Sequence, residues 1–292
     1  MTDFKSDRFV VIGVGLIGGS VARALRQSGT ARRIIGVGRG RANLDRALAL
    51  GVVDEVAANA AAAVRGADFV LMATPVRQNR VLLKEIADSL PPECVLTDAG
   101  STKGDFVADV QALLPHHLAK TVPGHPIAGA ERNGVEAADA RLFDGKNVVL
   151  TPIPENDPQA LDRVEALWRV CGAVVTRMST ERHDRIFSAV SHLPHVLAYV
   201  LVHAMAGRTD SGDLFRFAAG GFRDFTRIAG SSPEMWRDIS LANRQALLAD
   251  LNAYRERLGQ LAGMIEREDS NAIEQVYAIA REARAQWLQG KK

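Results

Sequence analysis

The stretch Phe9-Val10-Val11-Ile12-Gly13-Val14-Gly15-Leu16-Ile17-Gly18 decides the fold of the first half of this 292-residue chain. Four apolar residues of strand length lead into a Gly-x-Gly-x-x-Gly turn, and the residues that follow suit a helix. In this setting Gly13 makes the tight turn, Gly15 lets a pyrophosphate approach the backbone, and Gly18 lets the helix pack closely on the strand. The turn therefore predicts a dinucleotide site at the helix N-terminus, formed by Gly13, Gly15, Leu16, Ile17 and Gly18.

Composition favours a globular cytoplasmic protein. Hydrophobic residues make up 47% of the chain, enough to fill sizeable cores, and a net charge of +2 gives no argument for a nucleic-acid partner. Four glycines interrupt the first apolar stretch, which argues against a signal peptide. The longest later run, 196–206, is shorter than the roughly 18 residues of a membrane span, so we expect no membrane partner. Two cysteines, Cys94 and Cys171, cannot form a disulfide framework, which indicates a reducing cytoplasm.

Strand-like and helical segments alternate through the first half of the chain. Strands are expected at 33–38, 68–73, 94–97, 147–150 and 173–175, and helices at 44–50, 81–90 and 159–171. This alternation predicts an α/β fold with a doubly wound, Rossmann-type parallel sheet that the last αβ unit extends. Ligands of such sheets bind beyond the carboxyl ends of the strands, so we expect Thr74 and Pro75, which close the strand at 68–73, to contact the cofactor.

No strand pattern follows Met178-Ser179, so we predict a Rossmann domain at 1–178 and an all-α domain at 179–292. The segment 180–205 is expected to form one long helix that bends at Pro194. Farther on, apolar residues recur at helical spacing at Leu247, Leu251, Tyr254, Leu258, Leu261 and Ile265. A small helical domain cannot easily bury such faces alone. We therefore expect a homodimer whose helices share a core, with a self-contained bundle as the alternative.

The residues after the second strand indicate which dinucleotide binds. An enzyme that uses NAD usually places an acidic residue there to bond the ribose hydroxyls. Here the window reads Gly38-Arg39-Gly40-Arg41, and no acid occurs between Arg26 and Asp45. Guanidinium groups suit a 2′-phosphate, so we expect NADP held by Arg39 and Arg41, with NAD as the alternative if both arginines are solvated.

Three polar segments carry candidate chemistry. His125 is fixed between Gly124 and Pro126, which suits a proton acceptor in a pocket wall, although loop histidines are more often structural or exposed. Ser191 and His195 lie four residues apart and share a helix face. The His-x-x-His pattern that ends at His195 has no carboxylate at ligand spacing, so we expect no metal.

Arg223 and Arg227 are also four residues apart. Like charges at this spacing cost a few tenths of a kcal/mol unless an anion offsets them. The pair is either solvated or binds a substrate that carries carboxylates.

Together these segments resemble the prephenate and arogenate dehydrogenases of tyrosine biosynthesis. The resemblance runs from Val10 to about Arg244. Its carriers are Gly13-Val14-Gly15-Leu16-Ile17-Gly18-Gly19-Ser20, Asp98-Ala99-Gly100-Ser101-Thr102-Lys103, Gly124-His125-Pro126-Ile127-Ala128-Gly129, Ser191-His192-Leu193-Pro194-His195 and Phe222-Arg223-Asp224-Phe225-Thr226-Arg227-Ile228-Ala229. Such enzymes oxidatively decarboxylate a cyclohexadienyl ring that bears a 4-hydroxyl and a 1-carboxylate.

The resemblance implies a role for each candidate. His125 would take the proton of the 4-hydroxyl as hydride leaves C4, and Ser101 would share that hydroxyl and help to position the nicotinamide. Arg227 would hold a substrate carboxylate with Arg223 close by, and Ser191 and His195 would line the same pocket. Family members that use NAD carry an Asp near position 38, from which this chain departs. Since no regulatory or mutase domain is evident, we expect a monofunctional oxidoreductase.

Two other classes of Rossmann protein share some of these features but differ in their characteristic residues. The β-hydroxyacid and 6-phosphogluconate-type dehydrogenases typically place a catalytic lysine on the first helix of the second domain, and 180–205 contains no lysine. A redox-sensing regulator would need a basic nucleic-acid-binding element, and none is evident. Between the two substrates, Gly230-Ser231-Ser232 offers no acid for the amine of arogenate. This favours prephenate and leaves arogenate, or dual specificity, as the alternative.

Overall fold

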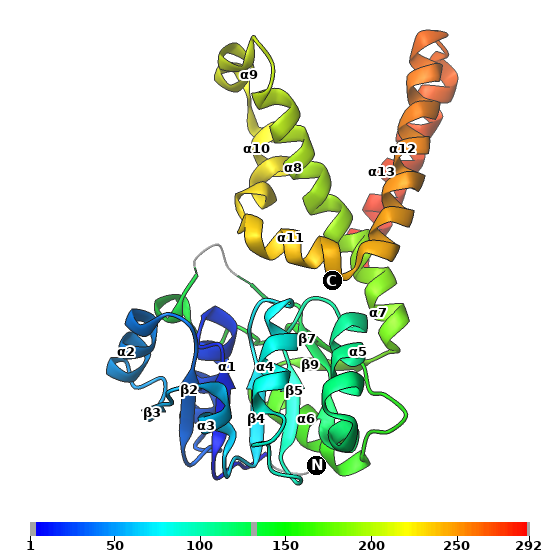
Figure 1. Ribbon diagram of the computed structural model, residues 1–292. Coiled ribbons are helices and arrows are strands. Elements are labelled where there is room, and N and C mark those ends of the chain that lie inside the picture. Colours follow the sequence, from blue (N-terminus) through cyan, green and yellow to red (C-terminus); the bar gives the residue numbers. More distant parts are fainter. Residues whose placement is uncertain (1–3, 130–132, 291–292) are drawn as a thin grey trace. The chain divides into compact units, whose positions relative to one another are not determined.

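The computed structural model describes residues 4–129 and 133–290 (Figure 1). They form two compact units, Met1–Arg244 and Gln245–Lys292. The first unit contains a six-stranded parallel sheet of order β3-β2-β1-β4-β5-β6. Its strands are β1 (Phe9–Ile12), β2 (Ile34–Val37), β3 (Glu55–Val56), β4 (Phe69–Met72), β5 (Val95–Asp98) and β6 (Thr121–Val122). The strand order reverses between β1 and β4, which is the Rossmann arrangement, so the predicted fold class is confirmed.

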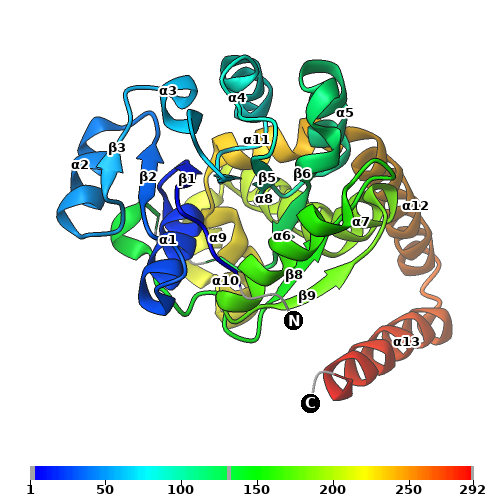
Figure 2. The ribbon, with the colours of Figure 1, turned by 90° about the horizontal axis from the view of Figure 1, so that it is seen from below.

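Helices cover both faces of this sheet, as Figure 2 shows. On one side lie α1 (Leu16–Ser28), α2 (Arg41–Ala49) and α6 (Pro158–Val170), and on the other α3 (Ala60–Val64), α4 (Gln78–Ile86) and α5 (Gly104–Leu113). Alternate strand residues point to opposite faces: Phe9 and Val11 join the first cluster, Val10 and Ile12 the second. Burial on both faces explains why the strands read as continuous apolar runs.

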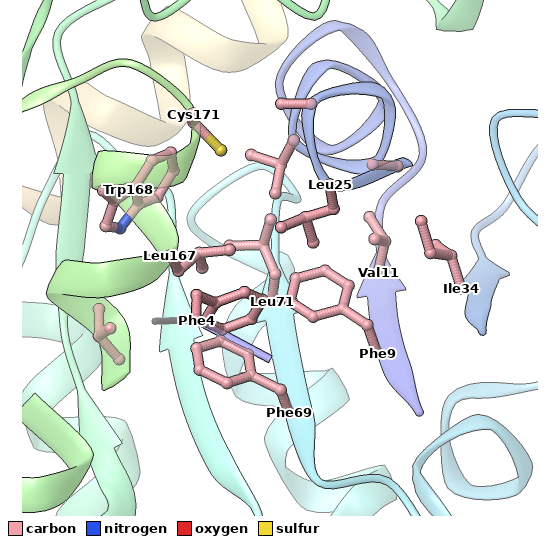
Figure 3. Close-up of a cluster of buried hydrophobic side chains, with 14 of the residues drawn as sticks. Phe4, Phe9, Val11, Leu25, Ile34, Phe69, Leu71, Leu167, Trp168 and Cys171 are labelled. Atoms are coloured by element: carbon pink, nitrogen blue, oxygen red, sulfur yellow. The ribbon is translucent and has the colours of Figure 1, made fainter. Parts of the chain in front are cut away.

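Figure 3 shows the cluster on the α1 and α6 side. Phe9 and Phe69 stack with ring centroids 5.3 Å apart, and Phe4 meets Phe69 edge-on at the same distance. Cys171 belongs to this cluster and Cys94 to the opposite one, and both thiols are free, as expected. Burial raises the pKa of each thiol to about 12, so neither ionises near neutral pH.

The prediction that the last αβ unit extends the parallel sheet was wrong. Strands β7 (Gly124–Pro126), β8 (Asn147–Leu150) and β9 (Val174–Arg177) form a second sheet, in which β7 and β8 are antiparallel. The chain passes from β6 to β7 through Pro123, which has no N–H to donate to a ladder. The strand therefore leaves β5 and pairs with β8, which places His125 in the second sheet.

The predicted long helix begins as expected, but its irregularity precedes Pro194. After α7 (Thr180–Phe187), the residues Ser188–His192 form a π-helical turn, and α8 (Leu193–Ala206) follows. Pro194 lies in the first turn of α8, where its missing N–H costs nothing. The interruption thus falls at a π-turn, a feature that often marks functional sites.

Among the described residues, Thr180–Ala206 is long and apolar enough to cross a membrane by length and composition, with a mean hydropathy of 1.4. This helical stretch is longer than the apolar run 196–206 that the sequence showed, because it includes the polar residues of α7 and the π-turn. The first half of the segment, however, carries the buried polar side chains of His183, Ser188 and His192. Only 17% of the tested window is buried, so much of its apolar surface is exposed in a single chain.

The first unit closes with three further helices, and the second unit contains two. These are α9 (Ser211–Phe217), α10 (Gly220–Thr226), α11 (Pro233–Ala242), α12 (Arg244–Glu266) and α13 (Ser270–Gln289). Helix α12 starts at the last residue of the first unit. Because α7 to α11 form one compact unit with the sheets, the predicted domain division after Met178 stays a prediction.

Candidate active site

Two adjoining cavities lie beyond the carboxyl ends of the strands. The first, of about 520 Å³, is lined by the β1–α1 turn and by the residues that follow β2 and β4. The second, of about 450 Å³, is lined by the start of α1, the loop after β5, strand β7 and helix α11. They share Gly15, Ala73, Thr74 and Pro75. An elongated ligand can therefore extend from one cavity into the other across these four residues.

Each glycine of the first turn is needed for a different structural reason. Gly13 has φ +99°, and a Cβ there would lie 2.4 Å from the carbonyl oxygen of Ala73. A Cβ on Gly18 would lie 2.2 Å from the carbonyl oxygen of Gly13. Nothing lies within 4 Å of a Cβ on Gly15, which lines both cavities at the N-terminus of α1. That open space and the helix N-terminus fit the pyrophosphate of a dinucleotide.

The predicted cofactor residues divide between the cavities. Gly13 and Arg39 line the first cavity, Leu16 and Ile17 line the second, and Thr74 and Pro75 line both. Gly18 lines neither cavity, because its role is to allow the close packing just described. Arg41 also lines neither: its Nε lies 2.9 Å from Oδ1 of Asp45, one helical turn away. Of the two predicted arginines, the structure brings Arg39 to the cavity.

The predicted base and its partner meet in the second cavity. His125 is half-buried in β7, and Ser101 follows β5, and both line this cavity. Met235 and Ile239 of α11 and its N-cap residue Ser232 also line this cavity. The other four predicted substrate residues, Ser191, His195, Arg223 and Arg227, are not among the residues that line it.

His195 is nevertheless linked to this cavity through α11. Its Nδ1–H donates to the carbonyl of Ser191 at 2.9 Å, and its ring stacks on Trp236 of α11 with centroids 3.6 Å apart. Burial and the nearby Arg227 guanidinium hold the pKa of His195 below its usual value. Both arginines are exposed, but the charge of Arg227 acts on His195, whereas the side chain of Arg223 is 83% exposed and lies 3.9 Å from Asp224.

The sequence analysis missed a chain of polar side chains behind His125. The Nδ1 atom of His125 lies 2.8 Å from Nε2 of His183, and Nδ1 of His183 lies 2.8 Å from Oδ1 of Asp184. His183 is fully buried at the start of α7. Spacing gave no signal for this contact, because 58 residues separate the two histidines.

A second missed feature is the buried pair Lys103 and Asp98, both within the Asp98–Lys103 motif. The Lys103 ammonium donates to the carboxylate of Asp98 and, at 2.7 Å, to the carbonyl of Gly124. The backbone N–H groups of Lys103 and Gly104 donate to the Asp184 carboxylate at 2.9 and 2.8 Å. The motif therefore connects β5, β7 and α7 around His125.

Electrostatics keep His125 neutral. Burial lowers its pKa well below the usual value, and interactions with His183, the Lys103 ammonium and His192 act in the same direction, because each disfavours a second proton on the ring. A neutral imidazole can accept a proton, so the cavity combines a candidate base, the Ser101 hydroxyl and an adjoining dinucleotide cleft. This fold and site define a dehydrogenase that binds a nicotinamide dinucleotide.

Comparison with known proteins agrees with that class. Residues 21–177 match the family model for the prephenate dehydrogenase nucleotide-binding domain, and residues 179–278 match the model for the prephenate dehydrogenase dimerization domain. The chain therefore belongs to the prephenate dehydrogenase family. It is a dehydrogenase, and a nicotinamide adenine dinucleotide is its cofactor.

Individual relatives cover nearly the whole chain. Prephenate dehydrogenase from Bacillus subtilis is 39% identical, over 95% of this chain and 75% of the relative. Cyclohexadienyl dehydrogenase from Zymomonas mobilis is 36% identical, over 97% of this chain and 96% of the relative. A crystal structure of prephenate dehydrogenase from Aquifex aeolicus in complex with hydroxyphenyl propionate and NAD⁺ superposes with a TM-score of 0.90 at 36% identity, covering 98% of this chain and 99% of that one.

Substitutions in the glycine turn should affect dinucleotide affinity and protein stability differently. Gly15→Ala places a Cβ in the open space shared by both cavities, at a residue with an ordinary extended backbone. We expect a dinucleotide Kd at least about tenfold higher, a loss of about 1.4 kcal/mol, with the melting temperature of the dinucleotide-free protein unchanged. Fluorescence titration and thermal unfolding measure the two effects. Gly18→Ala is the matched control, because its Cβ would meet backbone and should lower the melting temperature. Unchanged dinucleotide affinity in Gly15→Ala would show that the pyrophosphate lies elsewhere.

Proposed function

We propose that this enzyme oxidatively decarboxylates prephenate to 4-hydroxyphenylpyruvate in the cytoplasm, with NADP as the preferred cofactor, as a step of tyrosine biosynthesis. The observation that carries this proposal is the shared cavity: Ser101 and His125 face a space that adjoins the dinucleotide cleft through Gly15 and Ala73–Pro75. A substrate hydroxyl held there meets a neutral base beside the nicotinamide end of the cofactor.

The chain itself contributes orientation and one proton acceptor. His125 accepts the proton of the ring hydroxyl, and the Ser101 hydroxyl offers a second hydrogen bond to the same oxygen. The bound dinucleotide supplies the hydride acceptor. Loss of hydride and proton turns the carbinol carbon into a ketone. Carbon dioxide then leaves from the carbon opposite, and its bonding electrons make the ring aromatic and turn the ketone oxygen into a phenolate. The phenolate takes back the proton held by His125, which gives the product hydroxyl, and the aromatic ring drives the reaction forward.

The substrate carboxylates are assigned to the helical part of the first unit. Arg227 lies close enough to His195 for its charge to lower the pKa of that histidine, and we assign it to a carboxylate. We assign His195 and Ser191 to the polar side of the substrate site, next to Trp236. Arg223 is largely exposed and is assigned a smaller share of the binding energy.

Arogenate is the alternative substrate and differs in carrying an amine on the side chain. An amine would be stabilised by an acidic residue, and none of the described residues that line the second cavity is Asp or Glu. The hydroxyl residue Ser232, at the N-cap of α11, lines the cavity instead. This favours prephenate, and the ratio of kcat/KM for the two substrates measures the preference.

The proposed reaction is tested by incubating the protein with prephenate and NADP and following absorbance at 340 nm. His125→Asn should lower kcat about 10²–10⁴-fold with little change in KM, because the amide keeps a hydrogen bond but accepts no proton. Because the pKa of His125 is lowered, wild-type kcat/KM should stay level as pH falls through the usual histidine range and decline only below it. A variant with more than half of wild-type kcat would overturn the assignment of the base.

Substitution of Arg227 and of Arg223 should change the KM for prephenate by different amounts. Arg227→Ala should raise KM for prephenate about 10–100-fold, since a charge-assisted contact is worth about 1.5–3 kcal/mol. Arg223→Ala is the control on the same segment and should raise KM less. Steady-state kinetics with both variants decide this. Equal KM values for wild type and Arg227→Ala would place both arginines on the solvated surface.

The preference for NADP rests on the loop after β2. Gly38, Arg39 and Gly40 line the cavity where an NAD enzyme presents a carboxylate to the ribose. The carboxylate of Glu85 also lines this cavity, but it accepts the backbone N–H of Ala60 at 2.7 Å. Arg39 therefore remains available to a 2′-phosphate, while Arg41 first has to leave Asp45.

We expect a 10–100-fold preference for NADP over NAD in kcat/KM, because one partly exposed charged contact contributes about 1–2 kcal/mol. Gly38→Asp combined with Arg39→Ala should reverse the preference, and added salt should reduce it in the wild type. Arg41→Ala is the control that should change it less. Equal or better use of NAD by the unmodified enzyme would falsify this part of the proposal.

A homodimer is the proposed assembly. In the first unit, Val190, Val200 and Phe217 are 57–75% exposed, and in the second unit Leu258 and Ile265 are about half exposed. Monomers rarely expose apolar area on this scale, and residues 179–278 match a model described as a dimerization domain. A second copy is the partner that would cover these faces.

Light scattering at micromolar concentration should therefore return about twice the chain mass of 31.5 kDa. Leu258→Glu should shift the equilibrium toward the monomer, because it places a charge in the apolar stripe of α12. Gln260→Glu, which adds the same charge to the same helix at another exposed residue, is the matched control. A monomeric wild-type protein at this concentration would show that each chain satisfies its own apolar faces.

A further inference from the structure

We propose that His183 and Asp184 are positioning residues that hold His125 with Nε2 unprotonated, so that Nε2 is the atom that takes the substrate proton. The proposal rests on the proposed function of His125 as the base and deepens it. It is carried by the continuous contacts from the Asp184 carboxylate through the His183 ring to Nδ1 of His125.

The direction of these bonds begins at Asp184. Its carboxylate accepts the backbone N–H groups of Lys103 and Gly104 as well as His183. Burial raises the pKa of Asp184, but the bond from His183 and the two backbone bonds outweigh it and hold the pKa below its usual value. An ionised carboxylate only accepts hydrogen bonds, so Nδ1 of His183 carries a proton and donates it.

His183 has only that one ring proton. Burial lowers its pKa, with the Lys103 charge acting in the same direction, and the bond to Asp184 offsets this only in part. Neutral His183 therefore presents a bare Nε2 toward His125. Since a bare nitrogen accepts, Nδ1 of His125 must be the donor across the 2.8 Å between the two rings.

The same reasoning fixes the second nitrogen of His125. The charged and titratable groups that act on it are His183 of α7, Lys103 at the start of α5 and His192 of the π-turn, and all of them disfavour a second proton. Neutral His125 has a single ring proton, on Nδ1. Its Nε2 therefore keeps a lone pair. This is the tautomer that a base needs when its other nitrogen is bonded within the protein.

Packing prevents the rings from turning to another arrangement. Phe187 lies against both imidazoles, with centroids 4.9 Å from His125 and 4.5 Å from His183. Phe187 is itself buried, and His183 is fully buried. The chain of rings is thus held without water between its members.

The proton balance of the step is simple. The O–H bond of the substrate breaks and an N–H bond forms at Nε2, while the hydride from the carbinol carbon goes to the nicotinamide of the cofactor. His125 becomes an imidazolium that donates through Nδ1 to His183. The negative charge of Asp184 at the end of the chain stabilises this cation, so no proton has to pass to His183 or Asp184, and Nε2 can return its proton to the product oxygen after carbon dioxide leaves.

The tautomer can be measured directly and without substrate. In protein labelled with ¹⁵N-histidine, a long-range ¹H–¹⁵N correlation spectrum shows which ring nitrogen carries the proton, and His125→Asn assigns the signals among the seven histidines. We expect His125 with Nδ1 protonated and Nε2 bare. In Asp184→Asn the second tautomer should become populated, because the amide group no longer requires a donor from His183.

Kinetics give the second readout. His183→Gln and Asp184→Asn should each lower kcat about 10–100-fold, as supporting partners of reactive groups do, with KM for prephenate within about threefold of wild type. His117→Gln is the matched control: His117 is also buried and bonds a backbone carbonyl, that of Cys94 at 2.8 Å, and neither it nor Cys94 lines the cavity. Its kcat should not change.

The outcomes separate the two proposals. Wild-type His125 protonated on Nε2, or kcat within twofold of wild type in Asp184→Asn, would overturn the positioning role. If His183→Gln does not fold, Asp184→Asn and the wild-type spectrum still decide it. Retained kcat in His125→Asn would instead overturn the proposed base while leaving the tautomer measurement valid.

Discussion

The buried Lys103 ammonium is the interaction on which the site depends. It donates to Asp98 and to the carbonyl of Gly124, while the backbone N–H of the same residue donates to Asp184. Asp98 in turn accepts the N–H groups of Gly100 and Gly124. One residue therefore joins the end of β5, the start of α5, strand β7 and helix α7. Loss of one partner from such a buried pair typically costs about 3–5 kcal/mol, because the other charge is left uncompensated.

The same charge also tunes the chemistry. Lys103 disfavours a second proton on His125, so the group that anchors β7 helps to keep this histidine neutral. Gly124, held from both its N–H and its carbonyl, directly precedes His125 and fixes where that side chain emerges. The proposed base is thereby fixed beside a cleft whose glycine turn leaves open space for a pyrophosphate. The Lys103 charge therefore both holds β7 in place and favours the neutral form of His125.

Polar contacts also bind the helical residues of the first unit to this centre. Asn243, at the end of α11, donates to the carbonyl of Asp184 at 2.7 Å and to Nδ1 of His192 at 3.2 Å. Trp236 of the same helix stacks on His195. Helix α11 is therefore held to α7 and to the π-turn by its polar and aromatic side chains. This explains why it forms one wall of the second cavity although its sequence looks like an ordinary amphipathic helix.

The sequence determined what short-range rules control. The turn at Gly13–Gly18 and the helix and strand periods follow from neighbouring residues, and they predicted the Rossmann sheet. The position of His125 between glycine and proline marked it as a candidate, and the resemblance to a family implied its role as the base. Only the tertiary structure decided the second sheet, the pairing of Arg41 with Asp45, and the contact of His183 with His125. These depend on strand register and on which buried charges find partners. Residues 58 apart meet only after β6 has turned at Pro123 into β7, and no local pattern records that outcome.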